Sequence, residues 1–408
     1  MTVTVTVTDR TGRTRRSRPD AERRRRLAAL RAEMHRRGLD VVALTSPESV
    51  YYYAGLDHLG YFAFTLLVIP HDGAPVLVAR AMERPTLRAQ VPWLRHRAFL
   101  DGAGPAREIA VVLAGVVPRG GRVGLERSGM FLPPVLDAQI ASAVPSATVH
   151  DVTTMLRDRR AVKSPAEIAC TRQAARISDL AMAAALAAAG GGSATGRGNG
   201  GGLTDTKVAA QAVHTMIAEG GQTPGFAPLV RPTAALDQEH VTWSGRELRP
   251  GEGLFVELSG CVQRYHAPLS RTVYLGRTPP GAKRAHAAAL AGLRAAEAAL
   301  CPGATAAAVY TAWQEAVTAG GPSRTGRRPP LRHHCGYLVG IGFPPSWVGG
   351  GDVLGLRADS RAVVREGMTF HLMSWTTRPL GHVVSDTVLV TADGCERLTA
   401  TPRDLTVL

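Results

Sequence analysis

Hydrophobic positions near the N-terminus repeat with the spacing of an amphipathic helix. Leu27, Leu30 and Met34 fall on one face of such a helix, and most positions between them are charged or small. Asp20 offers a side-chain oxygen suited to capping the helix start, and Gly38 offers the stop. The pattern therefore predicts one surface helix that begins after Asp20 and ends at Gly38.

Short apolar runs follow this helix. The runs at 41–45, 64–70 and 74–79 are rich in Val, Leu and Ile. Runs of this length, bounded by turn residues, favour buried strands. Helical and strand-like patterns then alternate to about residue 152. We expect a compact α/β domain over residues 20–155.

The second half opens with a helix start. Ser164, Pro165 and Glu167 form a capping box with proline at the first helical position, and the helix is expected to reach about Ala189. The glycine-rich segment 190–202 is predicted to be a flexible loop. Further helices are expected at 205–218, 281–300 and 305–319, and paired strands at 253–260 and 270–276. This order is typical of an α+β domain with an antiparallel sheet, here over residues 156–408.

The composition fits a large globular protein. The chain has 408 residues, of which 45% are hydrophobic, enough for two or three domains. No run of about 18 apolar residues is present, so no membrane span is expected. The N-terminus lacks the pattern of a secretory signal, and the five cysteines are scattered and odd in number. We therefore expect a cytoplasmic protein.

The net charge of +15 is concentrated near the N-terminus. Residues 10–26 hold nine arginines against Asp20 and Glu22, and the remaining basic residues are dispersed. No basic stripe with interleaved aromatic residues is visible, as a nucleic-acid groove would require. We expect residues 1–19 to be a basic disordered arm, and we expect no nucleic-acid partner.

Three sequence blocks in the second half carry a resemblance. They are RYHAPLSRT at 264–272, GYLVGIGFPPSW at 336–347 and GMTFHLM at 367–373. They resemble the pita-bread superfamily, which includes methionine aminopeptidase, Xaa-Pro peptidases and creatinase, over roughly residues 155–400. The preceding part resembles the N-terminal domain of the creatinase and prolidase branch. The resemblance implies a creatinase-like α/β domain followed by a pita-bread catalytic domain.

The metal-bearing members of this superfamily carry five ligands, which this chain matches poorly. Counting back from the family's Arg-Thr pair aligns Glu257 and Pro268 with the two aspartates. Tyr337 falls at the histidine ligand, and Met373 and Ser385 fall at the two glutamates. A two-metal site needs hard oxygen donors and an imidazole, and of these residues only the glutamate is a good ligand. We expect no metal and no cofactor.

Within the superfamily, the three blocks resemble the metal-free branch of ectoine hydrolases. The segment that starts at His240 also resembles that branch, whereas the branch has an acidic residue where this chain has Val383. The resemblance implies a metal-independent hydrolase that cleaves a C–N bond of a small amino-acid-derived compound. The expected substrate is a cyclic amidine such as ectoine, opened to an acetylated diaminobutyrate.

Glu257 is the first catalytic candidate. A carboxylate can activate water, attack the amidine carbon directly, or pair with the amidinium group. The period of two along a strand gives Glu257 the face that would look onto the family's metal cavity, with Ser259 on the same face. The alternative is a structural glutamate that forms a salt bridge with Arg271.

Four further side chains are candidate catalytic groups. His371 shares the inward strand face with Met373 and can shuttle a proton, as can His266 by the same argument. His240 resembles a histidine that lines the substrate in the superfamily. Tyr337 can donate a proton to a leaving nitrogen. For each of them a packed core or cavity-filling role remains the alternative.

Five residues are expected to bind or surround the substrate. Ser385 can hydrogen-bond to it or simply make room, and Met373 and Pro268 are expected to form an apolar wall. Tyr265 and Trp347 are expected to form the pocket wall or its framework. The adjacent His333 and His334 do not form a metal site, because neighbouring side chains on a strand point to opposite faces.

Other functions remain open from the sequence. The chain can be a related enzyme on another small C–N compound, including one of secondary metabolism. It can be a dipeptidase of the Xaa-Pro type, which predicts metal-dependent activity, or a catalytically silent binding or scaffold protein. The resemblance also implies a homodimer whose N-terminal domain closes the partner's pocket, with residues 51–62 as the lid.

Overall fold

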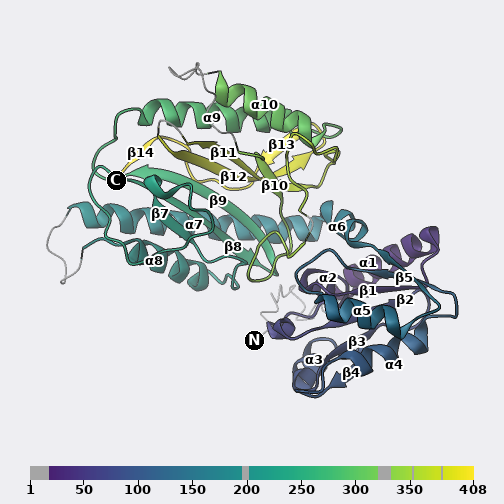
Figure 1. The fold of residues 1–408 in the computed structure, drawn as a ribbon. Helices are drawn as coiled ribbons and strands as arrows, with labels where there is room; N and C mark the ends of the chain where they lie inside the picture. The colour runs from purple at the N-terminus through teal and green to yellow at the C-terminus, as the bar shows by residue number, and fades with distance from the viewer. Residues whose placement is uncertain (1–17, 195–201, 320–331, 352, 378–379) are drawn as a thin grey trace, which may run out of the picture. The chain divides into compact units, whose positions relative to one another are not determined.

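A computed structural model describes residues 18–194, 202–319, 332–351, 353–377 and 380–408. The chain divides into two compact units, with the boundary between Arg157 and Asp158. Gly350 and Gly351 belong with the first unit. Each unit is described by itself (Figure 1).

The first unit is an α/β domain built on one six-stranded sheet. Its strand order is β4-β3-β2-β1-β5-β6. The central strand β1 (Val41–Leu44) pairs antiparallel with β2 (Leu66–Pro70) and parallel with β5 (Arg122–Leu125). The other elements are β3 (Val76–Arg80), β4 (Arg95–Phe99), β6 (Thr148–Asp151), α1 (Arg18–Arg37), α2 (Pro47–Ala54), η1 (Gly60–Phe62), η2 (Ala81–Glu83), α3 (Arg84–Gln90), α4 (Ala106–Val116) and α5 (Pro134–Ala143). The predicted strands are confirmed because these apolar runs are buried.

Helix α1 confirms the predicted apolar face but begins earlier than expected. Leu27, Leu30 and Met34 are buried, and Gly38 follows the helix with a φ of 63°. The described helix already includes Arg18 and Asp20, so Asp20 is not its cap. The cap prediction was wrong because an aspartate is also favourable within a helix near its N-terminal end, where its negative charge interacts well with the helix dipole. The rest of the expected basic arm lies outside the described residues.

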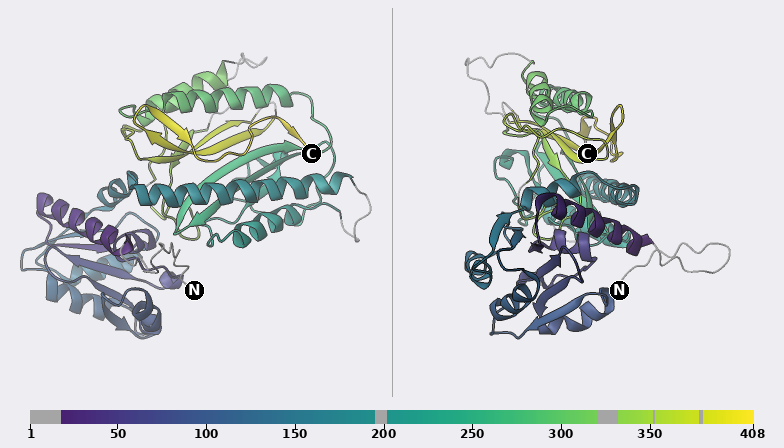
Figure 2. Two further views of the ribbon diagram at one scale, coloured as in Figure 1. Left: turned by 180° about the vertical axis from the view of Figure 1, so that it is seen from behind. Right: turned by 90° about the vertical axis from the view of Figure 1, so that its right-hand side faces the viewer.

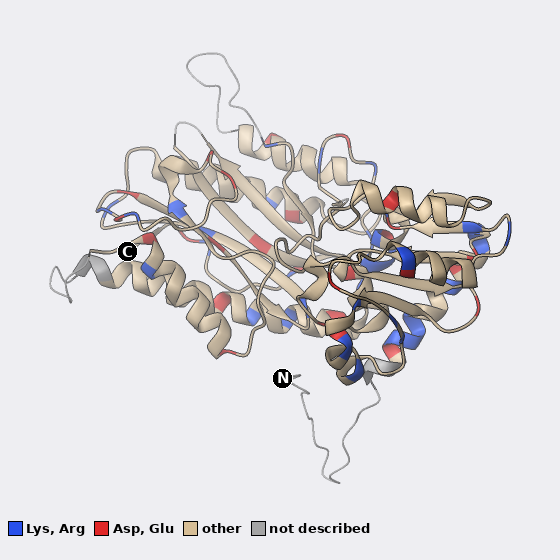
Figure 3. Ribbon diagram, turned by 60° about the horizontal axis from the view of Figure 1, so that its bottom comes forward, with Lys and Arg blue, Asp and Glu red and all other residues tan. Residues whose placement is uncertain are grey.

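Charges of both signs are interspersed along the described chain (Figure 3). On α1, Glu22 pairs with Arg25 and Arg26, and Glu33 pairs with Arg36. Such exposed pairs contribute little to stability, typically about 0.2–1 kcal/mol each. Among the described residues no helix is both long and apolar enough to cross a membrane.

The segment proposed as a lid has regular structure. Ser46 caps helix α2, which ends at Gly55 in the left-handed conformation with a φ of 81°. Tyr51, Tyr52 and Tyr53 therefore lie in the second half of this helix. Phe62 is 80% exposed at the end of the short helix η1. A role for residues 51–62 as a lid stays a prediction.

The second unit contains one curved sheet and four main helices. Its strand order is β10-β11-β12-β9-β8-β7, with β13 beside β12 and β14 beside β9. The strands are β7 (Leu229–Pro232), β8 (Gly253–Val262), β9 (Tyr265–Tyr274), β10 (Gly336–Leu338), β11 (Thr369–Thr376), β12 (His382–Thr391), β13 (Gly394–Arg397) and β14 (Thr406–Val407). The helices are α6 (Thr153–Ala161), which leads in from the first unit, α7 (Pro165–Ala194), α8 (Asp205–Ala218), η3 (Thr233–Ala235), α9 (Ala282–Ala299) and α10 (Ala306–Thr318).

One face of this sheet is covered by helices (Figure 2). Leu258 and Leu269, which lie opposite each other on β8 and β9, pack against α7 and α8. Leu372 and Val388 on β11 and β12 pack against α9 and α10. Because side chains alternate along a strand, the residues between these positions point to the other face. That face carries the candidate site.

Helix α7 is longer than the glycines in its last turns suggested. It continues through Gly190 and Gly191 to Ala194, so the predicted loop 190–202 is wrong over its first five positions. A glycine in a helix costs about 1 kcal/mol relative to alanine. Packing against α8 and the sheet offsets this cost, and Leu408 from the C-terminal segment lies against Gly190. Residues 195–201 lie outside the described part.

Candidate active site

A row of side chains crosses four strands on the open face of the sheet. Glu257 on β8 lies opposite Ser270 on β9, Ser270 opposite Ser385 on β12, and Ser385 opposite Met373 on β11. Directly opposed residues of antiparallel strands share a face. His371 precedes Met373 by two residues, so it shares this face as well. The register thus puts Glu257 and Met373, whose inward faces were predicted separately, on one face of the sheet.

Three of these side chains, together with Tyr337 and Trp347, form a continuous chain of hydrogen bonds. The indole Nε1 of Trp347 donates to the Tyr337 hydroxyl at 3.1 Å, and that hydroxyl lies 3.0 Å from Nδ1 of His371. Nε2 of His371 lies 2.7 Å from the Ser385 hydroxyl. The Ser385 hydroxyl in turn lies 2.7 Å from that of Ser270. We call the chain from Trp347 to Ser270 the relay.

The relay can hold its protons in two arrangements. Burial lowers the pKa of His371 to about 3, so its imidazole is neutral and carries one N–H. If the Tyr337 hydroxyl donates to Nδ1, then Nε2 donates to Ser385. If Nδ1 donates instead, Tyr337 accepts from both His371 and Trp347 and its own proton is free for a ligand. A proton lost by Tyr337 can therefore be replaced through His371.

Glu257 is a buried carboxylate with a strongly altered acidity. It is 4% exposed, and the charge of Arg231 acts on it. Burial raises its pKa to about 7, against the opposing effect of the Arg231 charge. Burial and the nearby Glu257 charge also raise the pKa of Tyr337. Glu257 can therefore accept or release a proton at neutral pH, opposite Ser270 and within electrostatic reach of Tyr337.

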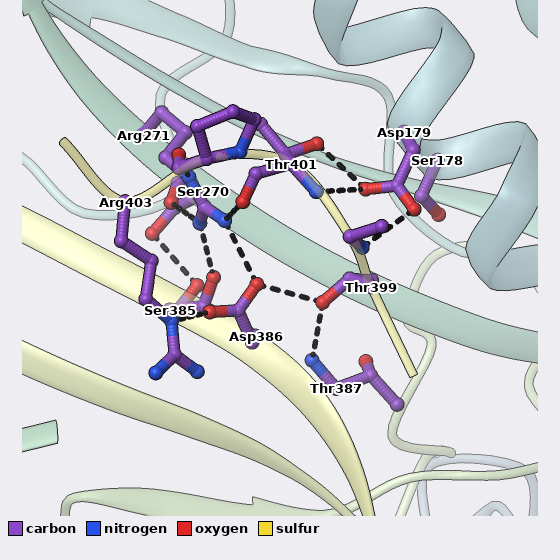
Figure 4. A network of polar contacts seen from close by, with 12 residues as sticks. Ser178, Asp179, Ser270, Arg271, Ser385, Asp386, Thr387, Thr399, Thr401 and Arg403 are labelled. Atoms are coloured by element: carbon purple, nitrogen blue, oxygen red, sulfur yellow. Dashed lines mark hydrogen bonds and ion pairs between the residues drawn. The ribbon is translucent and has the colours of Figure 1, made fainter. Parts of the chain in front are cut away.

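Arg271 does not pair with Glu257, the salt-bridge partner considered from the sequence. Its guanidinium donates to Asp386 at 2.9 Å and to the backbone carbonyls of Ser385 and Pro402. Asp386 also accepts from Thr399 and pairs with Arg403 (Figure 4). The salt-bridge alternative for Glu257 is therefore wrong. The network lies directly behind Ser385 and fixes the strand that carries it.

Two of the predicted site residues have structural partners. His266 is fully buried: Nδ1 donates to the carbonyl of Arg264 at 2.9 Å, and Nε2 accepts from the amide of Gly225 at 2.9 Å. With both nitrogens occupied, His266 is held as framework. Tyr265 donates its hydroxyl to Glu167 at 2.5 Å and ties β9 to the first turn of α7.

His240 lies apart from the relay. It is an exposed residue in the left-handed conformation, with a φ of 58°. Its ring stacks on Phe226, with 5.8 Å between the ring centres, and Phe226 meets Trp347 edge to face at 4.6 Å. His240 therefore reaches the site only through two aromatic rings in this conformation, and a direct catalytic contact stays a prediction.

The remaining predicted residues shape the walls. Met373 belongs to an apolar cluster with Phe255, Trp375 and Val383, against which Tyr337 packs. Pro268 lies within β9, where its carbonyl accepts a hydrogen bond from Thr387 at 2.7 Å. Met373 therefore lies in an apolar cluster, whereas the wall role of Pro268 stays a prediction.

Sequence reasoning did not identify two arginines near this site. Arg231 on β7 and Arg332 before β10 both lie over aromatic rings of the apolar cluster. The signal for Arg231 was present, because an arginine inside a short apolar strand is unusual. Arg332 gave no such signal, since it stands at the end of a basic segment.

The donor set of the site does not fit a pair of hard divalent cations. Among the described residues, no group of three or more His, Cys, Asp or Glu side chains is placed to hold a metal ion. Pro268 offers no side-chain donor and Met373 offers only a thioether. One carboxylate, Glu257, cannot bridge and neutralise two such ions.

The fold and the site define a two-domain hydrolase of the creatinase and prolidase type. The profile of the creatinase/prolidase N-terminal domain matches residues 26–162, and that of metallopeptidase family M24 matches residues 169–392. The chain belongs to metallopeptidase family M24. The family resemblance and the fold class predicted from the sequence are thereby confirmed.

Individual relatives match over nearly the whole chain. An ectoine hydrolase of Halomonas elongata is 30% identical over 94% of this chain and 96% of its own. The dipeptidase PepE of Mycobacterium ulcerans is 25% identical in structure-based comparison, with a TM-score of 0.77 over 95% of this chain and 98% of its own. A prolidase of Thermococcus sibiricus has a TM-score of 0.80 at 18% identity, over 94% of this chain and 99% of its own, and supports the fold alone.

Proposed function

We propose that the protein is a metal-independent hydrolase that cleaves a C–N bond in a small cyclic amidine such as ectoine. One observation carries this proposal. A buried carboxylate with a pKa of about 7, that of Glu257, lies within electrostatic reach of a hydrogen-bonded tyrosine, Tyr337, and both stand at positions that the resemblance assigns to metal ligands. The similarity to a relative named ectoine hydrolase supports the substrate class.

Glu257 is assigned as the general base. In its ionised form it removes a proton from water as the water oxygen bonds to the amidinium carbon. The neutral adduct carries a hydroxyl and two nitrogens on that carbon. A pKa near 7 keeps a substantial fraction of the carboxylate ionised at neutral pH and still makes it a competent base, as proton transfer requires.

Tyr337 is assigned as the proton donor to the leaving nitrogen. As the adduct collapses, its hydroxyl becomes a carbonyl and the electron pair of the ring C–N bond stays on nitrogen. That nitrogen takes one proton from Tyr337, which recovers one through His371. The same nitrogen takes a second proton, the one released by the adduct hydroxyl. One amidinium and one water thus yield an amide and an ammonium group. Glu257 returns its proton to the relay.

The opposite end of the relay is held in place by neutral groups. Ser385 and Ser270 accept or donate in either direction, so they allow His371 to change its protonated nitrogen without becoming charged. A buried imidazolium would be costly at this position, as the low pKa of His371 indicates.

The test compares three substrates with and without metal. The purified protein is stripped with a chelator and assayed on ectoine, on creatine and on an Xaa-Pro dipeptide, with and without added manganese. We expect ectoine to be opened in the presence of chelator. Glu257→Gln should abolish turnover, whereas the exposed control Glu219→Gln should retain it.

Each other outcome favours a named alternative. Turnover of the dipeptide only with manganese would refute the proposal and indicate a dipeptidase, the activity named for the PepE relative. Turnover of creatine alone in the presence of chelator would indicate a related metal-independent enzyme that acts on a small C–N compound other than ectoine. Failure of all three substrates to react would refute ectoine as the substrate and leave either another small substrate or a catalytically silent binding or scaffold protein. A cytoplasmic homodimer whose N-terminal domain closes the partner's pocket is part of the same proposal.

A further inference from the structure

Two arginine side chains lie on the wall of the site and take no part in the relay. Arg231 lies opposite Phe255, and its guanidinium carbon is 4.7 Å from the centre of that ring. The guanidinium carbon of Arg332 is 3.6 Å from the centre of the Trp375 ring. The two rings are 6.0 Å apart, so neighbouring aromatic rings support both cations.

Arg231 is buried without a full set of hydrogen-bond partners. It is 4% exposed, and within the described residues its Nε has no partner. Its Nη1 reaches the carbonyl of Val241 at 3.4 Å, which is longer than a normal hydrogen bond. A guanidinium has five N–H donors, and leaving them unsatisfied in a buried position is unfavourable. A ligand with acceptor oxygens would remove this penalty.

The two guanidiniums act on each other and on Glu257. Burial and, as a smaller effect, the Arg231 charge lower the pKa of Arg332 to about 10. Burial also lowers the pKa of Arg231, while the charges of Glu257 and Asp237 raise it. Arg231 is therefore close to both the second arginine and the proposed base. An anion placed between the arginines would relieve their mutual repulsion.

A carboxylate of the protein already forms an ion pair with one of these two guanidinium groups. Glu239, an exposed residue in the loop after η3, forms an ion pair with Arg332. Arg332 is thus accessible to a carboxylate from the solvent side. Because Glu239 keeps 43% of its side-chain surface exposed, a ligand that also engages Arg231 can replace it at small cost.

We propose that Arg231 and Arg332 form the subsite that binds the carboxylate of the substrate, with Glu239 as the group that the ligand displaces. This inference rests on the proposed function, since it takes the Glu257 face as the reaction site. It restricts the substrates to compounds that carry a carboxylate near the amidine. Hydrogen bonds to charged groups contribute about 1.5–3 kcal/mol, so the neutral carboxamide should bind roughly tenfold to a hundredfold more weakly.

The first measurement uses a probe that does not depend on turnover. The protein is titrated with acetate and with the neutral acetamide, and the fluorescence of Trp375 is isolated by comparison with Trp375→Phe. Acetate should change the signal and acetamide should not. Arg231→Met and Arg332→Met should remove the response, whereas the exposed control Arg246→Met should keep it.

A second variant guards against loss of folding. Glu239→Gln changes only a partly exposed side chain and removes the competing carboxylate, so acetate should bind severalfold more tightly. Unchanged acetate binding in Glu239→Gln, or an intact response in both arginine variants, would overturn the proposal.

The second measurement compares ectoine with its carboxamide. Arg332→Met should raise KM for ectoine at least tenfold with a small change in kcat, and should leave the carboxamide unaffected. Equal processing of both compounds by the unmodified protein would overturn the subsite while leaving the proposed function intact. An acetate response without any ectoine turnover would refute the proposed function and retain the subsite.

Discussion

Replacing Glu257 by glutamine should abolish activity and at the same time stabilise the protein at alkaline pH. The carboxyl group has a pKa of about 7 in the folded chain, against 4.5 for an unperturbed glutamate. Between these values the folded state binds more protons than the unfolded state, so unfolding free energy falls as pH rises. The contribution of Glu257 to stability is complete below pH 4.5 and is lost as pH rises through 7.

The size of this effect follows from the pKa difference. Each pKa unit corresponds to about 1.36 kcal/mol, so the ionised carboxylate lowers the unfolding free energy by roughly 3 kcal/mol above pH 8. Glutamine has the same shape and no charge. Relative to the unmodified protein, Glu257→Gln should therefore gain about 2–3 kcal/mol at pH 8.5 and close to nothing at pH 4.5. Loss of the attraction to Arg231 is already contained in the pKa.

Urea unfolding at several pH values provides the assay. Four of the five tryptophans, Trp243, Trp313, Trp347 and Trp375, lie in the second unit, so fluorescence reports mainly on the unit that contains Glu257. The exposed control Glu219→Gln should show no pH-dependent gain. Equal stability of Glu257→Gln and the unmodified protein at pH 8.5 would refute the argument that this carboxylate is charged and poorly solvated in the fold.

Further predictions concern the relay, its pH dependence and the network behind it. Tyr337→Phe should lower kcat about a hundredfold with little change in KM, and an unchanged kcat would exclude Tyr337 as proton donor. The rate should rise about tenfold per pH unit below pH 7, as Glu257 ionises, and level off above it; a rate that falls over this range would exclude its role as base. His371→Gln should lower the rate without shifting the pH range over which the rate rises, because the pKa of His371 lies near 3. A shift of that pH range would contradict this assignment. Asp386→Asn should lower the unfolding free energy by about 3–5 kcal/mol in a denaturation experiment, since the buried Arg271 loses its counter-charge; a change below 1 kcal/mol would contradict the network's importance.

The sequence was sufficient to predict the common face of the site. Strand periodicity related His371 to Met373 and Glu257 to Ser259, and the motif blocks supplied which strands belong together. The hydrogen bonds of the relay were not predictable, because they depend on how β10, β11, β12 and β9 are aligned across the sheet. The partner of Arg271 was mispredicted for the same reason.

Long-range contacts also account for the other differences. His266 has the spacing of a site residue, yet the amide of Gly225, far away in sequence, occupies one of its nitrogens. Helix α7 continues past Gly190 because tertiary packing outweighs glycine's low helix propensity. Arg332 is recognisable as a site residue only once Trp375 is known to lie beneath it.

The network behind Ser385 has a consequence for biosynthesis. Arg271 needs the carbonyls of Thr401 and Pro402, and β14 completes the edge of β9 only after those residues are in place. While the ribosome still holds this part of the chain, Arg271 on β9 lacks two of its acceptors and Asp386 lacks Thr399. The first unit can fold during translation, whereas the site in the second unit can be completed only after residues beyond Thr399 have emerged. A nascent or prematurely ended chain would therefore be poorly ordered there and a preferred target for chaperones and proteases.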